Sequence, residues 1–266
     1  MGDCVLVRRY AELDQSIGLV VGDGACLVVD TRGDVVRGAE LAAAVREVTA
    51  APWTVVLTHA HWDHAFGTES FLPTEVWAHE KCHADLVTNG DRQKADTAAW
   101  YLTNHRPEDA ERVSAVQPVL PDQLMTDRAE LTVGGRGVVL AHFGPGHTDN
   151  DIVVHVPDAG VVFAGDLVEQ GAPPSFGDAY PQEWPTAVDG ILALAPRVVS
   201  PGHGEPVAVD FVAGQRAELA LLATLCADVI AGRSDERDAL LRSPYPGGVL
   251  DTAIERTRAT RPGAAK

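Results

Sequence analysis

Paired cysteines are the first feature that this sequence lacks. Its cysteines, Cys4, Cys26, Cys82 and Cys226, are widely scattered, and no two of them form a Cys-x-x-Cys pair. A chain of 266 residues can bury a core large enough to need no disulfide bridges. We therefore expect free thiols in a reducing, cytoplasmic environment.

Long apolar runs are also missing. No segment approaches the roughly 20 consecutive apolar residues of a membrane-spanning helix. The first residues, MGDCVLVRRYAELDQS, lack the apolar core that follows a basic segment in a secretory signal. We therefore expect no membrane partner and no export.

Positive charge is scarce. The chain has 21 Lys and Arg residues against 38 Asp and Glu residues, a formal net charge of −17. Such a field repels phosphate backbones, so we expect no nucleic-acid partner. The excess acid serves solubility in the simplest interpretation, and bound metal cations would neutralise part of it. The expected partner is a small-molecule substrate, and the oligomeric state stays open.

Strand-like apolar runs occur in two sets, each followed by helices. The first set is CVLVRRY, SIGLVV, CLVVD, WTVVL and EVWAH, and the second is AELTV, GVVLAHF, DIVVHV, GVVFAG and RVVS. Apolar residues at helical spacing predict helices over 34–49, 182–194 and 210–230. This order predicts an α/β fold in which two β-sheets pack face to face with helices outside.

Two segments differ from this alternation. Residues 79–113 are polar and helical in character, with Trp100 and Tyr101 in the middle, and we interpret them as a helical insertion. The tail after Arg256, TRATRPGAAK, is weakly basic and is expected to be loose. We take residues 1–266 as a single domain with its C-terminal helix at about 210–230.

The stretch THAHWDHA carries the strongest chemical signal. It places His59, His61, Asp63 and His64 directly after the buried strand WTVVL. In open α/β sheets such strand ends commonly carry the functional site. The His-x-His spacing lets two side chains converge on one ion. Asp63 and His64 reach a second ion more easily than the first, so the motif indicates two adjacent metal sites.

Further ligands are expected at other strand ends, and three candidates occur there. GPGHTDND contains His147, VVFAGDL contains Asp166 just past a strand, and VVSPGHGEP contains His203. Each follows a glycine, which lets the backbone turn sharply near an ion. A carboxylate such as Asp166 can bridge two ions. Imidazole and carboxylate donors favour zinc, with iron or manganese as alternatives.

The loops THAHWDH, GPGHT, AGD and PGHG resemble, in order and rough spacing, the metal motifs of the metallo-β-lactamase-fold hydrolases. The resemblance runs from LVVDT to PGHGEP. It implies an αββα sandwich of two mixed β-sheets flanked by helices, with a two-metal site at one edge and the 79–113 insertion near its mouth. The implied ligands are His59, His61 and His147 for the first ion, Asp63, His64 and His203 for the second, and Asp166 as the bridge.

The chemistry that the resemblance implies is hydrolysis. Two divalent ions, with zinc preferred, hold a bridging hydroxide that attacks a carbonyl or phosphoryl centre. Asp63 is the catalytic candidate, because it could bind metal and also orient the hydroxide. No protein nucleophile is required, so no covalent intermediate is expected.

Branches of the family differ at identifiable positions. The best-known exported β-lactamases carry a cysteine ligand where Asp166 is aligned, so β-lactam hydrolysis is at most a minor activity. Glyoxalase II shares the ligands, but Arg216 and Arg233 are the main candidate glutathione anchors here and neither is clear. Quorum-signal lactonases have a tyrosine three residues after the bridging aspartate, where this chain has Glu169.

The remaining resemblance is to glyoxalase II-like cytosolic hydrolases, including those associated with quinoprotein systems. The preferred substrate is a small ester, thioester or lactone. The alternative is a mononuclear-iron enzyme like the persulfide dioxygenases, which would not need His64 and His203 as ligands. A non-catalytic scaffold that keeps the fold is a further alternative, and the intact ligand set argues against it.

Several other residues have open interpretations. Asp30 ends the strand CLVVD and could orient a ligand histidine, with Asp149 and Thr148 as weaker candidates. Trp62, Trp100 and Tyr101 could line the substrate pocket or pack on the core. Four further histidines are interpreted as structural or solvated rather than as ligands of a third metal: His79, His83, His142 and His155.

Overall fold

Two mixed β-sheets form the centre of the protein in the computed structural model, which describes residues 4–261. The first sheet has the strand order β1-β2-β3-β4-β5-β6, and the second has the order β11-β10-β9-β8-β7. In the first sheet β1 to β3 pair antiparallel, and β3 to β6 pair parallel. In the second sheet only the pair β10–β11 is parallel. The bounds are β1 Val5–Arg9, β2 Ser16–Val21, β3 Cys26–Val29, β4 Trp53–Val56, β5 Val76–His79, β6 Gln123–Met125, β7 Arg128–Val133, β8 Arg136–Ala141, β9 Val153–Val156, β10 Val161–Glu169 and β11 Val198–His203.

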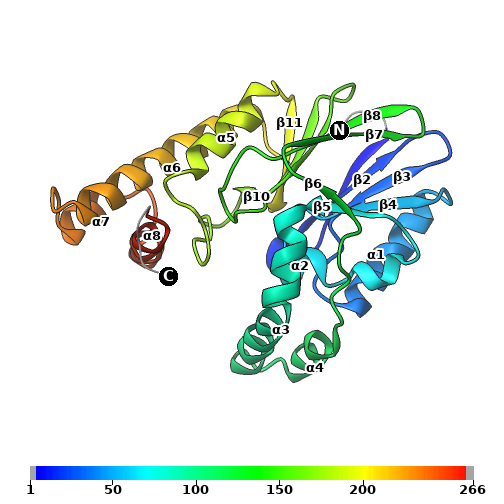
Figure 1. Ribbon diagram of the computed structural model, residues 1–266, viewed down its shortest axis with the longest axis horizontal. Coiled ribbons are helices and arrows are strands. Elements are labelled where there is room, and N and C mark those ends of the chain that lie inside the picture. Colours follow the sequence, from blue (N-terminus) through cyan, green and yellow to red (C-terminus); the bar gives the residue numbers. More distant parts are fainter. Residues whose placement is uncertain (1–3, 262–266) are drawn as a thin grey trace.

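Helices cover the outer face of each sheet (Figure 1). Helices α1 to α4 lie on the side of the first sheet, with α4 packed on α3, and helices α5 to α8 lie on the side of the second, with α7 and α8 packed on α6. The bounds are α1 Val35–Val48, α2 Trp62–Ala65, α3 Glu80–Thr103, α4 Pro107–Ala115, α5 Trp184–Ala193, α6 Val209–Ile230, α7 Glu236–Arg242 and α8 Gly247–Thr260, with short 3₁₀ turns η1 Glu12–Asp14 and η2 Thr68–Phe71. The predicted αββα sandwich is therefore confirmed.

Side-chain alternation explains why the strands read as continuous apolar runs. Along β2 and β3, Val20 and Leu27 point into the layer between the sheets, while Leu19 and Val28 point toward the helices of the first sheet. Neighbouring residues of a strand face opposite sides, and both sides are buried here. The two sheets therefore pack face to face, and the strand ends that carry the motifs lie at one edge of this sandwich.

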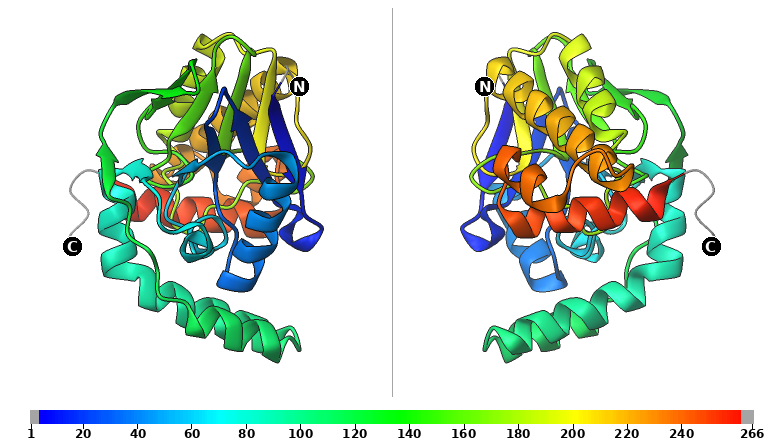
Figure 2. Two further views of the ribbon diagram at one scale, coloured as in Figure 1. Left: turned by 90° about the vertical axis from the view of Figure 1, so that its right-hand side faces the viewer. Right: turned by 90° about the vertical axis from the view of Figure 1, so that its left-hand side faces the viewer.

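Helices α3 and α4 occupy most of the stretch 79–113 that was predicted to be helical, and α4 continues two residues beyond it. Figure 2 shows this segment, coloured cyan to green, extending away from the two sheets. Its anchor is Tyr101, which is fully buried and donates a hydrogen bond to Glu12 over 3.0 Å. Arg37 and Arg106 pair with the same carboxylate. That this segment is an insertion in a single domain of residues 1–266 stays a prediction.

The prediction of a loose segment after Arg256 is wrong as far as Thr260, because helix α8 continues to that residue. The reason is the apolar spacing in its first turns: Leu250, Ala253 and Ile254 are buried in the same cluster as α6. Residues 262–266 of the predicted tail lie outside the described part of the chain. Strand β6 and helices α7 and α8 were not predicted from the sequence.

Two predicted absences can be compared with the described structure. None of the helices in residues 4–261 combines the length and apolar character that a membrane crossing needs. All four cysteines are free thiols, as expected, and three of them, Cys26, Cys82 and Cys226, are buried.

Candidate metal centre

The strand ends bring the seven predicted ligands together at one edge of the two sheets. His59 and His61 lie in the loop after β4, and Asp63 and His64 lie in the short helix α2. His147 comes from the loop between β8 and β9. The other two are Asp166 and His203. Asp166 was predicted just past a strand but lies within β10, at an irregularity in its pairing with β11, and His203 is the last residue of β11.

One group of donor atoms comes from His59, His61, His147 and Asp166. The Nδ1 atom of His61 and the Nε2 atom of His147 are 2.9 Å apart. One carboxylate oxygen of Asp166 lies 3.5 Å from His147 Nε2 and 3.9 Å from His59 Nε2. We call this group the first half-site.

A second group comes from Asp63, His64 and His203, and we call it the second half-site. The Nε2 atom of His203 lies 3.2 Å from Asp63 Oδ2 and 3.3 Å from His64 Nε2. Asp166 reaches this group too, because its Oδ1 is 3.3 Å from His64 Nε2 and its Oδ2 is 3.3 Å from His203 Nε2. Its carboxylate therefore lies between the two half-sites, where the sequence predicted a bridge.

These residues fit a pair of divalent ions. Ligands at zinc–nitrogen bond lengths in a tetrahedron are separated by about 3.4 Å, close to the observed separations. The Nε2 atom of His59 is buried and has no hydrogen-bond partner among the described residues. A buried imidazole nitrogen without a partner is costly unless it binds something. The donor set, histidine with aspartate, is one that zinc accepts.

Asp30 contacts His64 of the second half-site on the side away from the other donor atoms, as expected for a residue that orients a ligand histidine. Its carboxylate accepts hydrogen bonds from the backbone N–H and the hydroxyl of Thr58, both over 2.8 Å. It also lies 2.9 Å from His64 Nδ1. A carboxylate on Nδ1 fixes the imidazole so that Nε2 faces the ion. Asp30 has a φ of 68°, a left-handed conformation that aspartate tolerates better than most residues.

The N-terminal turn η1 supports the same half-site, which sequence reasoning missed. The backbone carbonyl of Leu13 lies 2.7 Å from His203 Nδ1. The side-chain amide of Gln15 donates a hydrogen bond to the backbone carbonyl of Asp63. Because one support is a main-chain carbonyl, no residue type in the sequence could have signalled it.

Asp178 is a further residue that the sequence did not single out. Its Oδ2 lies 3.0 Å from His61 Nε2, on the opposite side of the ring from the nitrogen that faces the first half-site. It belongs to the loop between β10 and α5, and its side chain is 53% exposed. The only sequence signal is a carboxylate in the Gly- and Pro-rich stretch QGAPPSFGDAYP, which is a weak one.

The electrostatics of the two half-sites differ in the metal-free chain. Burial lowers the pKa of His59, and it lowers the pKa of His147 to about 4. Burial also acts on His64 and His203, but Asp166 and Asp63 outweigh it, so the pKa of His64 is raised and that of His203 rises to about 12. The first half-site therefore offers two neutral imidazoles, whereas the second holds protons between histidines and carboxylates.

Gly202 leaves room for the Asp166 carboxylate between the two half-sites. A Cβ atom built on Gly202 would lie 1.8 Å from Asp166 Oδ1 and 3.0 Å from the backbone of Gly165. No side chain fits that space without moving Asp166. This close approach of the backbone to Asp166 is the reason that a residue without a side chain precedes His203.

The half-sites open into a pocket of about 910 Å³. One face of α3 lines it with Asp85, Arg92, Asp96 and Trp100, and Asp178 lies among the residues of the loop after β10 that also line it. Arg92 is the only arginine or lysine among the described lining residues, and the carboxylates outnumber it. The pocket therefore suits an uncharged substrate better than a polyanion.

The aromatic residues divide between the two interpretations left open by the sequence. Trp62 lines the pocket and also packs edge-on against Tyr101, with ring centroids 5.8 Å apart. Trp100 lines the pocket and is 45% exposed. Tyr101 anchors α3 and does not line the pocket.

The remaining predicted residues lie outside the group of donor atoms. His79 is buried and stacks on His142, with ring centroids 4.3 Å apart, which matches the structural interpretation. Arg216 and Arg233 pair with acidic neighbours and do not line the 910 Å³ pocket. Glu169 is buried at the pocket wall, where burial raises its pKa to about 8.

The fold and the donor cluster define the class: a metallo-β-lactamase-fold protein with a histidine–aspartate centre at the sheet edge. Residues 11–203 match the family model of the Metallo-beta-lactamase superfamily. That match covers most of the chain, so the protein belongs to this superfamily, as the sequence resemblance implied.

Curated relatives include two kinds of protein. The acyl-coenzyme A thioesterase MBLAC2 of Gallus gallus is 30% identical over 168 residues, 59% of this chain and 58% of the relative. The metallo-beta-lactamase type 2 of Bacillus cereus is 28% identical over 156 residues, 57% of this chain and 51% of the relative. The chain thus spans little more than half the length of these two proteins.

Solved structures show the same fold at low sequence identity. A metallo-beta-lactamase from Pontibacter korlensis superposes with a TM-score of 0.59 at 20% identity, over 81% of this chain and 92% of that one. The sec-alkylsulfatase Pisa1 from Pseudomonas sp. superposes with a TM-score of 0.76 at 15% identity, over 97% of this chain and 50% of that one.

Proposed function

We propose that this chain is a hydrolase that uses two divalent metal ions, zinc in the first instance, on a small-molecule ester, thioester or lactone. The observation that carries the proposal is the buried, unpartnered His59 Nε2 within a group of imidazole and carboxylate atoms spaced as metal ligands are. Bound ions would supply a water of lowered pKa and a Lewis acid for the substrate's carbonyl oxygen.

The chain's own residues have distinct proposed roles. His59, His61 and His147 would bind the first ion, and His64, His203 and Asp63 the second, with Asp166 shared. Asp63 is also the proposed catalytic residue, holding the attacking water in line with the substrate. This proposal is supported by the position of Asp63, which lines the pocket and lies 3.2 Å from His203.

The relatives and the pocket narrow the substrate class. The thioesterase name of the Gallus gallus relative supports the thioester branch of the proposal. The single Arg92 in the described pocket lining gives few partners for the phosphates of a coenzyme carrier. We therefore propose that an uncharged acyl portion enters the pocket and that any charged carrier stays outside it. A cytoplasmic location and the absence of nucleic-acid partners stay predictions.

The first test is metal content per chain, measured together with hydrolysis of a substrate panel. The panel contains esters, acyl thioesters with and without coenzyme A, lactones and a β-lactam. An alkyl sulfate is added because a linear primary-alkylsulfatase of Pseudomonas sp. is 24% identical over 218 residues. Two zinc ions per chain, with chelator-sensitive hydrolysis of one neutral class, is the expected result.

Other outcomes would replace the proposal with a stated alternative. One iron per chain with oxygen uptake and no hydrolysis would favour the persulfide dioxygenase-like enzyme. Hydrolysis of the β-lactam alone would favour the lactamase branch. A protein that binds no metal after exposure to zinc, iron or manganese would contradict the proposed function altogether.

A further inference from the structure

We propose that Asp178 is a positioning residue for His61, and that Arg256 of the C-terminal helix α8 holds Asp178 in place. The inference rests on the proposed function, because it assigns His61 to the first metal ion. It adds a dependence of that half-site on α8, which lies beyond the region matched by the family model.

The contact between Asp178 and His61 has the geometry of a positioning interaction. The imidazole presents Nδ1 toward His147 and receives the carboxylate of Asp178 at Nε2, 3.0 Å away. A carboxylate there keeps the proton on Nε2, so the lone pair of Nδ1 points at the ion position. Asp178 would thus do for the first half-site what Asp30 does for the second.

The backbone of Asp178 is held by one arginine of α8. Arg256 Nη2 donates a hydrogen bond to the backbone carbonyl of Asp178 over 2.7 Å, and its Nε donates to the carbonyl of Ala179 over 3.1 Å. The two donors lie on one planar guanidinium, so they fix both carbonyls at once. Because the Asp178 side chain is about half exposed, its position depends on this backbone rather than on surrounding side chains.

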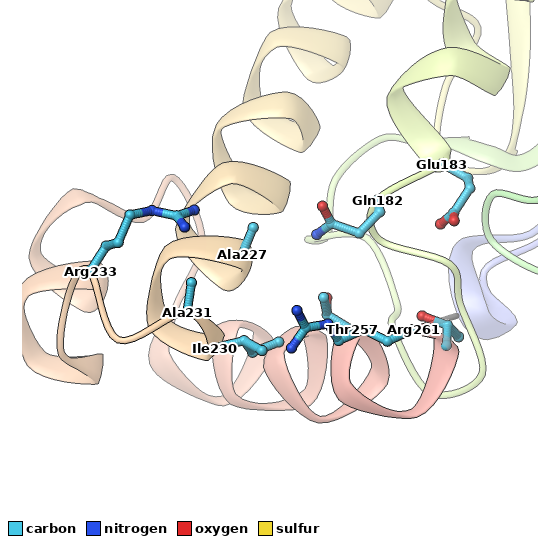
Figure 3. Close-up of a pocket in the computed structure, with 9 residues that line it drawn as sticks. Gln182, Glu183, Ala227, Ile230, Ala231, Arg233, Thr257 and Arg261 are labelled. Carbon is cyan, nitrogen blue, oxygen red and sulfur yellow. The ribbon is translucent and has the colours of Figure 1, made fainter. Parts of the chain in front are cut away.

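The hydrogen bonds from Arg256 to the loop lie beside a cavity rather than in the packed core. Thr257, the next residue of α8, and Gln182, in the loop that carries Asp178, line a cavity of about 310 Å³. Figure 3 shows Thr257 and Gln182 on opposite sides of that cavity, with Ala227 and Ile230 of α6 beside them. The loop is therefore not packed tightly against α8 along this side, and the guanidinium spans the two elements by hydrogen bonds.

The test compares metal affinity in three single variants of the full chain. Asp178→Asn removes the carboxylate, Arg256→Ala removes both backbone hydrogen bonds, and Arg256→Lys keeps the charge with one donor group. The matched control is Arg258→Ala, because Arg258 lies two residues further along α8 and, among residues 4–261, its guanidinium contacts Glu236 alone, over 3.4 Å. Affinity is measured by zinc competition with a chromophoric chelator, and the cobalt(II) absorption spectrum reports the ligand geometry.

In Asp178→Asn, binding of one ion should weaken by about 10- to 100-fold while the other keeps wild-type affinity. Arg256→Ala should weaken the same ion by a smaller factor and alter the same cobalt band, and Arg256→Lys should recover part of the loss. Adding Arg256→Ala to Asp178→Asn should cause no further loss. Arg258→Ala should match the wild type.

Two results would overturn the inference and leave the proposed function standing. One is a wild type that binds two ions and an Asp178→Asn variant that binds both equally well. The other is a full additional loss when the two substitutions are combined, since Arg256 would then act independently of Asp178. Melting temperatures identify any variant that fails to fold. If Arg256→Ala does not fold, the metal affinity of the conservative Arg256→Lys variant tests the role of Arg256.

Discussion

The two half-sites are built from similar side chains but are supported in different ways. Asp30, behind His64, is 2% exposed and follows directly after strand β3. Asp178, behind His61, is about half exposed and lies on a loop that α8 holds. The second half-site is therefore part of the sheet framework, whereas the first depends on a surface loop.

The carboxylates of Asp30 and Asp178 also differ in the number of hydrogen bonds that they accept. Asp30 receives the backbone N–H and the hydroxyl of Thr58 as well as His64, so its removal leaves several buried donors without a partner. The Asp178 carboxylate contacts His61 and is half exposed, so water can reach it. Loss of a buried partner costs more than loss of an exposed one, because water cannot replace it.

The largest effect should come from a change that breaks both half-sites at once. In Gly202→Ala the new methyl group would meet Asp166 Oδ1 at 1.8 Å, so the shared carboxylate must move. We expect both ions to bind about 100-fold more weakly or worse, with a stability loss of about 1–3 kcal/mol from overpacking. Chelator competition and a thermal melt measure the two effects.

The control for that variant is Gly214→Ala in α6. A Cβ at Gly214 meets nothing within 4 Å, and alanine should stabilise the exposed helix position by up to about 1 kcal/mol. If Gly202→Ala binds two ions as the wild type does, the carboxylate of Asp166 is not the bridge between the half-sites.

A smaller effect, confined to the second half-site, should follow from Asp30→Asn. Asparagine tolerates the positive φ at this position, so the backbone is preserved. It cannot accept from Thr58 and His64 as a carboxylate does, so we expect one ion to bind about 10- to 100-fold more weakly. Because the substitution removes charge-assisted hydrogen bonds of Asp30, the free energy of unfolding should fall by about 1.5–3 kcal/mol.

Comparing the Asp30→Asn and Asp178→Asn variants tests whether the two half-sites are supported separately. The Asp30 variant should lose stability and the second ion, and the Asp178 variant should lose affinity for the first ion with little change in melting temperature. Asp23→Asn, at the exposed turn between β2 and β3, is the control for removing one negative charge. Loss of the same ion in both variants would show that the half-sites are not supported separately.

The pH dependence of metal loading should separate the half-sites further. His64 and His203 have raised pKa values in the metal-free chain, so protons compete with the second ion at neutral pH. Of the histidines in the first group only His61 has a raised pKa, about 9, because burial is outweighed by the hydrogen bond and charge of Asp178 together with the charges of Asp63 and Asp166. Each proton released on binding weakens the ion's affinity about tenfold per unit fall in pH.

As the pH falls from 8 to 6, the second ion should therefore leave before the first. Metal content after dialysis at each pH gives the order of loss. Calorimetry in buffers of different ionisation enthalpy should count more protons released by the second ion than by the first. Equal proton counts would contradict the electrostatic difference between the half-sites.

The candidate ligands could be found in the sequence because each lies in a short motif in or next to a strand. THAHWDH, GPGHT and PGHG report local geometry, and the sheet order brings their ends to one edge. Asp30 was predictable for the same reason, since it directly follows the strand CLVVD. The fold followed from two sets of apolar runs whose strands are buried on both faces.

One support of each half-site was not predictable, because it depends on a contact between distant parts of the chain. His61 and Asp178 are 117 residues apart, and His203 and the carbonyl of Leu13 are 190 residues apart. Neither pair belongs to a motif. Helix α8 was missed because its start, PYPGGV, reads as a turn and its apolar face shows only against α6.

The smallest expected effect comes from a pocket residue that belongs to neither half-site. Trp100 lies on the α3 wall of the pocket and is 45% exposed, so Trp100→Ala should leave metal content and melting temperature unchanged. The substitution removes an apolar contact with the substrate that contributes about 1 kcal/mol to binding. We therefore expect KM to rise roughly fivefold while kcat stays nearly constant.

The control is Leu102→Ala, because Leu102 is an exposed apolar residue of α3 that is not among the residues lining the pocket. Steady-state kinetics on the best substrate of the panel decide the matter: a fall in kcat with unchanged KM would mean that the α3 wall acts on the chemistry at the ions and not on substrate binding.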